Sequence, residues 1–231
     1  MNKVLKGLLT WFILPVIIIV LAYLIVASVM EPVNFNKERA AREKVAIQQL
    51  KDIRTLQEAY KSENGKFVST VDSLKAFYET GKVKVVFQVG SADDSVAVLH
   101  TAAVKRANRR ITDKQLLDMY EAGDKNLVFR IESQIPVKDT LFNNRPDFDI
   151  NKLSVIPFSE GDPVEMQATV KMVSGVKVPL FEACMPYKSL LKGLDNQLRI
   201  NLDAERNDTG RYPGLKVGSI TAPNNNAGNW E

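Results

Sequence analysis

The chain opens with a long uninterrupted apolar stretch. Leu8 to Met30 contains no Asp, Glu, Lys, Arg or His, and a helix of that length is roughly 35 Å long. The hydrocarbon core of a bilayer is about 30 Å thick, so this stretch is long enough to cross it. Trp11 lies near one end, at a depth that suits an interfacial aromatic ring. The pattern predicts a transmembrane helix over residues 8–30, preceded by a short basic segment, residues 1–7.

A cleaved secretory signal is the alternative interpretation of the same stretch. The apolar core of such a signal usually has about 7–15 residues, which is shorter than the stretch found here. Val26, Ala27 and Ser28 do supply the small residues of a cleavage site. The single cysteine, Cys184, lies far from this region, which excludes a lipid-modified N-terminal cysteine. We therefore interpret residues 8–30 as a permanent single-pass anchor.

After the anchor, apolar and polar residues alternate with helical periodicity. The predicted helix-packing face is made of Ala46, Leu50, Ile53, Gln57 and Tyr60, which follow one another at spacings of three and four.

The ends of this second helix also have sequence signals. Asn64 and Gly65 form a typical helix end, and Pro32 disfavours helical backbone at Glu31, so we expect a kink or break at the junction. The sequence thus predicts an amphipathic juxtamembrane helix within residues 31–66. A free-standing stalk or a coiled coil remains an alternative for this segment.

Residues 67–222 mix both kinds of pattern. Helical spacing predicts helices over residues 70–81, 112–126 and 186–207. Alternation and β-branched residues predict strands over residues 82–90, 95–100, 126–133, 153–158 and 164–173, and a short strand after Tyr212. Ser174 and Gly175 predict a hairpin turn, and Pro179 predicts a sheet edge or a strand end. The fold class expected is therefore α+β, with a kinked N-terminal helix followed by an antiparallel-sheet domain outside the cytoplasm.

Charge and cysteine content limit the choice of function. The formal net charge of the chain is +4, too small to indicate a nucleic-acid-binding protein. With one cysteine there is no intramolecular disulfide, and Cys184 lies in an apolar stretch where we expect a small buried residue rather than a nucleophile.

Little in the sequence points to catalysis. His100 is the only histidine, and at the end of an apolar segment it is expected to be structural. One histidine and one cysteine cannot build the usual transition-metal sites, and no nucleophile, nucleotide or dinucleotide motif occurs. The carboxylate pairs Asp93/Asp94, Asp147/Asp149 and Asp203/Glu205 are interpreted as solvated turns rather than calcium ligands. We predict no catalytic residue, no metal, no cofactor and no small-molecule substrate.

Two surface segments have less specific signals. Lys105, Arg106, Arg109 and Arg110 form a basic run without aromatic residues, which indicates a solvated loop or a partner-facing patch. The polar tail, residues 223–231, ends close to Trp230 and is expected to be a frayed terminus, with a docked tail as the alternative.

The first third of the chain, residues 1–80, resembles the type IV pilins and the pseudopilins of type II secretion. The resemblance rests on the leader ending in Lys6 and Gly7, the apolar helix with a proline near its end, and the segments "REKVAIQQLKDIRTLQEAYKSENGKF" and "STVDSLKAF". In that family the leader is removed after the glycine, which here implies a processing junction between Gly7 and Leu8. The sequence departs from the family at Phe12, the fifth position after that junction, where most members have a glutamate.

These features together predict a non-enzymatic, single-pass protein of a bacterial inner membrane, with a cytoplasmic N-terminus. The resemblance implies a pilin-like or pseudopilin-like component of a filament or secretion apparatus. Its partners would be the membrane and proteins of an envelope assembly, with self-association as one option and nucleic acid excluded. The alternative is a bitopic assembly-platform scaffold with a helical stalk and a ferredoxin-like periplasmic domain. An anchored hydrolase or binding protein is a third class, but no motif supports it.

Overall fold

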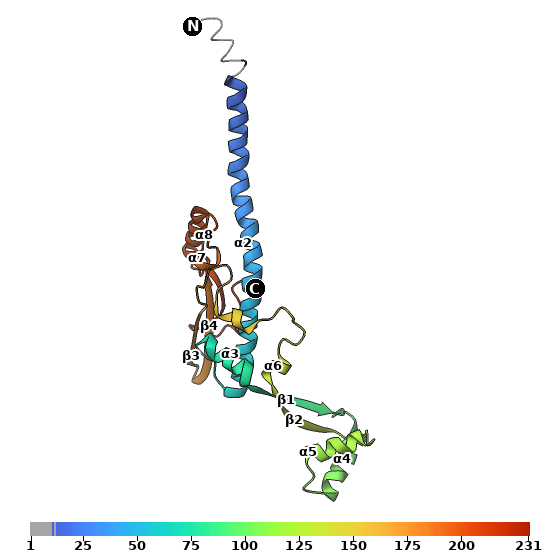
Figure 1. Ribbon diagram of the computed structural model, residues 1–231. Helices are drawn as coiled ribbons and strands as arrows, with labels where there is room; N and C mark the ends of the chain where they lie inside the picture. Colours follow the sequence, from blue (N-terminus) through green and yellow to red (C-terminus); the bar gives the residue numbers. More distant parts are fainter. Residues whose placement is uncertain (1–10, 12) are drawn as a thin grey trace, which may run out of the picture.

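One helix, α2 (Leu14–Asn64), dominates the structure, a computed structural model that describes Trp11 and residues 13–231 (Figure 1). Its 51 residues correspond to a length of roughly 77 Å. The helix ends where the sequence predicts, because Gly65 adopts a left-handed φ of 70° and its N–H binds the carbonyl of Lys61. The predicted helix pair is thus one continuous element.

Pro32 lies inside α2, and the helix continues through it, so of the two expected outcomes, a kink or a break, the break does not occur. Proline removes one backbone hydrogen bond and crowds the preceding turn, which a helix tolerates when the segments on both sides are stable. The apolar run before Pro32 and the packed half that begins near Phe35 supply that stability.

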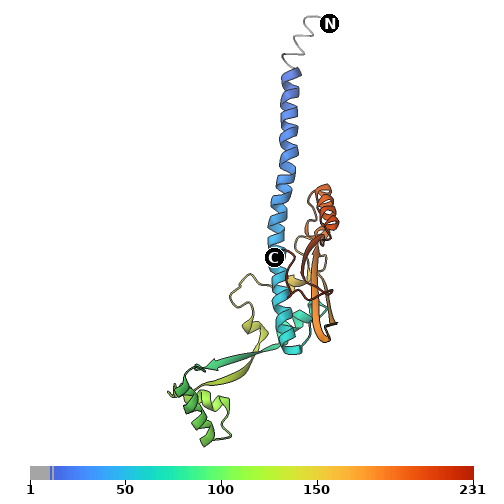
Figure 2. The same cartoon turned by 180° about the vertical axis from the view of Figure 1, so that it is seen from behind.

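The N-terminal half of α2 projects away from the rest of the protein (Figure 2). Its apolar side chains are exposed on every side, as in Ile19, Ile25 and Tyr23, which are 68%, 65% and 71% exposed. Within the described residues, α2 is the one helix that is long and apolar enough to cross a membrane. This finding confirms a candidate single-pass span.

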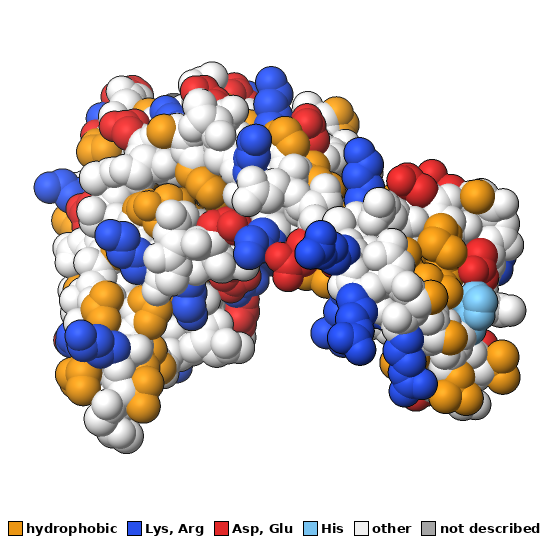
Figure 3. Space-filling model, turned by 90° about the horizontal axis from the view of Figure 1, so that it is seen from below, with side chains coloured by type: hydrophobic (Ala, Val, Ile, Leu, Met, Phe, Trp, Pro, Cys, Tyr) orange, Lys and Arg blue, Asp and Glu red, His pale blue; other side chains and the backbone are white. Residues whose placement is uncertain are grey.

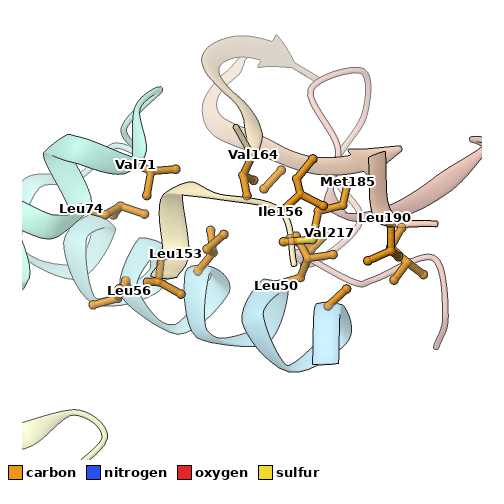
Figure 4. Close-up of a cluster of buried hydrophobic side chains, with 14 of the residues drawn as sticks. Leu50, Leu56, Val71, Leu74, Leu153, Ile156, Val164, Met185, Leu190 and Val217 are labelled. Carbon is orange, nitrogen blue, oxygen red and sulfur yellow. The ribbon is translucent and has the colours of Figure 1, made fainter. Parts of the chain in front are cut away.

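The C-terminal half of α2 packs against a three-stranded antiparallel sheet, in the order β3 (Glu165–Val173), β4 (Val176–Pro186) and β5 (Gly214–Gly218). Leu50 and Leu56 point from α2 into a core that contains Met185 and Val217 of the sheet (Figure 4). This α2–sheet unit, with its short helices, is called the head below. The mixed α+β fold is the class that the sequence predicts.

The hairpin of the sheet confirms its sequence signal. Ser174 and Gly175, with φ of 50° and 83°, join strands that pair from Val173 with Val176 onward. Pro179 lies in β4 beyond the stretch Glu182–Pro186 that pairs with β5. Its missing N–H is therefore tolerated, because β4 has only one neighbouring strand at that position.

Short helices complete the head. They are α3 (Val71–Thr80), α6 (Val137–Thr140), the 3-10 helix η2 (Ile150–Ser154), α7 (Tyr187–Leu190) and α8 (Asn196–Asp208). Helix α3 agrees with the sequence prediction, and Thr70 caps it by accepting a hydrogen bond from the N–H of Ser73.

Two other predictions in the head are wrong. The strand expected over residues 153–158 does not form. Its first two residues belong to η2, which Asp149 caps, and Val155 makes only an isolated bridge with Pro163. The Gln49 amide binds the carbonyls of Lys152 and Val155. The single helix expected over residues 186–207 is divided into α7 and α8. Gly193, with a φ of 83°, lies in the connection, and Asp195 then caps α8.

A second unit, the arm (residues 82–136), extends from the head at the end opposite the N-terminus (Figure 1). Strands β1 (Lys82–Val89) and β2 (Phe129–Pro136) form an antiparallel ribbon that carries α4 (Ser95–Ala107) and α5 (Asp113–Glu121). The arm has its own small core of Leu116, Leu127 and Phe129.

The strand predicted over residues 95–100 is wrong, since these residues begin helix α4. The Asp94 carboxylate accepts hydrogen bonds from the N–H groups of Val96 and Ala97, which caps the helix. Ala97 and Thr101 are buried at a spacing of four residues. The apolar run is thus one side of a helix rather than an alternating strand.

The C-terminal tail is docked, so the expectation of a frayed terminus is wrong. The Arg54 guanidinium of α2 lies 2.7 Å from the Glu231 carboxylate, and Asn226 donates to Glu58. Gly228 pairs with Val217 of β5 and lies directly under the Trp230 ring, where a Cβ would come within 2.3 Å. The tail therefore fastens the sheet to α2.

We predict that Ile53→Asp unfolds the head, because Ile53 is fully buried and a carboxylate there has no partner. The expected loss exceeds about 4 kcal/mol of unfolding free energy. Urea unfolding of the full chain in detergent, followed by the fluorescence of docked Trp230, measures it.

Val45→Asp is the matched control, since Val45 is a β-branched residue of the same helix that is 48% exposed. It should change the unfolding free energy by less than about 1 kcal/mol. An unchanged unfolding midpoint for Ile53→Asp would contradict the packing described for α2.

Candidate functional site

The candidate functional site is α2 itself, through the two surfaces that it offers. Of the predicted packing residues, Ala46, Leu50, Ile53 and Gln57 are fully buried, and Tyr60 is half-buried. The structure brings all five to the side of α2 that faces the head. Gly7, Leu8 and Phe12, which carry the predicted processing junction and the departure from the family, lie outside the described residues.

Gln57 is the polar member of this face, and its amide is fully used. Nε2 donates to the carbonyl of Val68 at 2.7 Å, and Oε1 accepts from the N–H of Val68 at 3.1 Å. These two hydrogen bonds hold the segment that follows α2 against the helix. The side-chain amide binds both the N–H and the C=O of Val68, as a neighbouring strand would. The side chain thereby satisfies its hydrogen bonds without contact to water.

Close to its apolar half, α2 holds the α7–α8 region by polar contacts. Tyr187 donates to the Glu43 carboxylate at 2.6 Å and accepts from Arg206 at 2.8 Å. Burial and the neighbouring Glu43 raise the pKa of Tyr187, so its hydroxyl stays protonated. Arg42 adds hydrogen bonds to the carbonyls of Leu190 and Lys192. These contacts fix the head at the level where the apolar half of α2 begins.

A buried ion pair lies further along the helix. Asp52 is only 5% exposed, and its carboxylate binds the Arg145 guanidinium and the Gln48 amide. Burial raises the pKa of Asp52 despite the opposing effect of Arg145, while the hydrogen bond to Asp52 raises the pKa of Arg145. The pair joins α2 to the irregular connection between α6 and η2.

A cavity of about 510 Å³ opens beside this ion pair, between α2 and the connection before η2. Its charged lining is balanced: three cations and three carboxylates, from Lys44, Arg145, Lys152, Asp52, Asp147 and Asp149. Asp147 also binds Arg145, and Asp149 caps η2. The carboxylates of this predicted turn therefore serve local structure.

The other residues with catalytic potential lie apart from this site. His100 is on α4 in the arm, where Nε2 lies 2.8 Å from the Asp124 carboxylate. Cys184 is buried in β4, and burial raises the pKa of its thiol to about 12, so the thiolate is suppressed at neutral pH. Asp203 binds Arg199 within α8.

Sequence reasoning missed several residues of this site, above all Gln49, Asp52 and Glu43. On a helical wheel Gln49 and Glu43 lie at the two borders of the apolar stripe and Asp52 lies beyond one border, and polar residues at such positions are expected to be exposed to solvent. They are covered because connections distant in sequence fold over these positions of the helix. The one usable signal was the proximity of Gln49 and Asp52 to the apolar stripe.

No model of a known protein family matches the chain, and no match was found among curated proteins or solved structures. The class of protein is therefore defined by the structure alone. It is a mixed α+β protein whose described residues include one candidate membrane-spanning helix.

We predict that Arg145→Ala costs more stability than Asp52→Asn. Removing Arg145 leaves a buried carboxylate without its charged partner, with an expected loss of about 2–3 kcal/mol. Removing the charge of Asp52 leaves an arginine that is partly exposed and still next to Asp147, so the loss should be smaller. Equal losses in urea unfolding at pH 7 would contradict this asymmetry.

The pH dependence gives an independent check. A raised carboxyl pKa in the folded state means that the stability contributed by its protonation is lost as the pH rises through that pKa. The stability difference between Arg145→Ala and wild type should therefore shrink as the pH falls from 7 into the acidic range and Asp52 takes up a proton. If the difference in unfolding free energy between Arg145→Ala and wild type stays constant over this pH range, the loss does not arise from the unpaired Asp52 carboxylate.

Proposed function

We propose that the protein is a non-enzymatic, single-pass component of a bacterial cell envelope, of pilin-like or pseudopilin-like type, in a filament or secretion apparatus. The observation that carries the proposal is the double use of α2. One half of this continuous helix is apolar and exposed on all sides, and the other half is the central core element of the head.

The exposed half needs an apolar environment. Leaving side chains such as Ile19, Leu24 and Ile25 in water is unfavourable by roughly 1.5–3 kcal/mol for each one that could be buried. A bilayer supplies that environment for an isolated copy, and neighbouring copies supply it within a filament. A single segment can therefore serve as a membrane anchor and as a packing element.

The proposed location is the inner membrane, with residues 1–7 in the cytoplasm and the head outside. Lys3 and Lys6 precede the span in a very short segment, whereas the cations after it are mixed with Glu38 and Glu43. Positive charge close to a span favours the cytoplasmic side, and long domains cross largely regardless of charge.

The scaffold remains the second candidate because Phe12 stands where the pilin family has a glutamate. The structure supports the first candidate more strongly on two points. Residues 46–57 of α2 are buried in the head and so are not a free-standing stalk. The head sheet follows the sequential order β3-β4-β5, which differs from the βαββαβ order of a ferredoxin-like domain.

Intact-mass measurement of the protein purified from its native membrane distinguishes the pilin-like component from the fixed scaffold. For the pilin-like function we expect the mature chain to lack the first seven residues and to begin at Leu8. Replacing Gly7 by a bulky residue such as Leu should then preserve the full-length mass. A wild-type chain that keeps residues 1–7 would reject the pilin-like function in favour of the fixed scaffold.

A further inference from the structure

The outer side of α4 in the arm has an unusual combination of exposed side chains. Val96 and Leu99 are 66% and 71% exposed, and the basic run begins less than two turns later on the same helix. Val96, Leu99 and Arg106 lie on one side of the helix, and we define the α4 face by these three residues together with the neighbouring cations at its C-terminal end, Lys105, Arg109 and Arg110. Figure 3 shows the arm as a separate lobe with both hydrophobic and basic side chains on its surface.

In the part of the chain that the structure describes, the four cations of the α4 face form no ion pair. The ion pairs of the arm join Lys84 with Glu132 and His100 with Asp124, so within the described residues none involves the basic run. Lys105 and Arg106 lie in the last turn of α4, where they also complement the helix dipole. That explanation does not extend to Arg109 and Arg110, which follow the end of the helix.

The helix that carries this face is held firmly. Thr101 is buried and its hydroxyl donates to the carbonyl of Ala97 and accepts from the N–H of Val128, which fastens α4 to the start of β2. The His100–Asp124 contact fastens the same helix to the segment after α5. The α4 face is thus presented in a fixed orientation, which lowers the entropic cost of docking.

The anchor's own bilayer is out of reach of the α4 face. Between Met30, at the end of the apolar stretch, and Asn64, α2 extends roughly 50 Å. The arm lies beyond that end of α2 in both views (Figures 1 and 2). Lipid headgroups of the membrane that holds α2 are therefore not its ligand.

A phosphate polymer also fits poorly. Binding of single-stranded nucleic acid uses aromatic side chains for base stacking, and the α4 face has none. A phosphate polymer also offers no apolar surface that would cover Val96 and Leu99. Protein interfaces, in contrast, combine an apolar centre with polar surroundings and are enriched in arginine.

We propose that the α4 face docks a partner protein whose contact surface carries carboxylates beside an apolar patch. The carboxylates pair with the basic run, and the apolar patch covers Val96 and Leu99. The ionic part determines specificity and the rate of encounter, and burial of the apolar part slows dissociation.

Site-specific photo-crosslinking in cells that carry the protein natively tests this proposal. A photoreactive phenylalanine derivative replaces Leu99 in the full-length chain, and the control position is Met172 of β3, which is 63% exposed. We expect one discrete protein adduct from position 99 and none from position 172. Mass spectrometry of the adduct should place the crosslink in a partner segment with Asp or Glu beside apolar residues.

Charge reversal separates specific docking from chance proximity. Arg106→Glu with Arg109→Glu should lower the adduct yield at least fivefold, whereas Lys171→Glu with Lys177→Glu on the β3–β4 hairpin should leave it within twofold. Unchanged far-ultraviolet circular dichroism and thermal unfolding of the full chain check that the head and the arm of each variant are folded. The proposal is overturned by an adduct with lipid, nucleic acid or another copy of this chain, by a yield insensitive to reversal, or by no adduct.

Discussion

Burial of one stripe of α2 is the interaction on which the rest of the structure depends. Ala46, Leu50, Ile53 and Leu56 are fully excluded from water, and the sheet, α3 and η2 all lie around them. Without this burial the three strands would have one uncovered apolar face, and such a small sheet is not stable alone. Because α2 is continuous, the same burial joins the candidate membrane-spanning half of the helix rigidly to the head.

Polar contacts determine the position and orientation of the head on that helix. Gln57 replaces a backbone partner for Val68, Glu43 and Tyr187 fix the α7–α8 region, and Asp52 holds the connection before η2 through Arg145. Such buried polar contacts add little net stability. If the head packed on α2 in another position, however, these polar groups would be buried without partners. The docked tail adds Arg54 and Glu231 on the remaining side. The head therefore has a defined position along α2.

The sequence predicted those parts of the fold that depend on local pattern. The apolar span, the packing stripe, the end at Gly65 and the Ser174–Gly175 hairpin are all encoded by neighbouring residues. One error was local, since residues 95–100 belong to a helix that the adjacent Asp94 caps. Other errors arose where distant contacts decide. Residues 150–154 form a 3-10 turn that Gln49 of α2 binds from a hundred positions away. Tail docking likewise depends on Arg54 and Glu58, which no local pattern connects with residues 226–231.

The most direct test of this account is a spin-label accessibility scan along α2 in lipid bilayers, from residue 14 to residue 64. The account predicts uniformly high exposure to oxygen, and low exposure to a water-soluble nickel reagent, over residues 14–30. From Phe35 to Gln57 it predicts a 3.6-residue alternation, with minima of both signals at positions 46, 50, 53 and 57. A water-exposed break at Pro32, or equal exposure of all faces as far as Asn64, would contradict the claim that one helix serves both the membrane and the head.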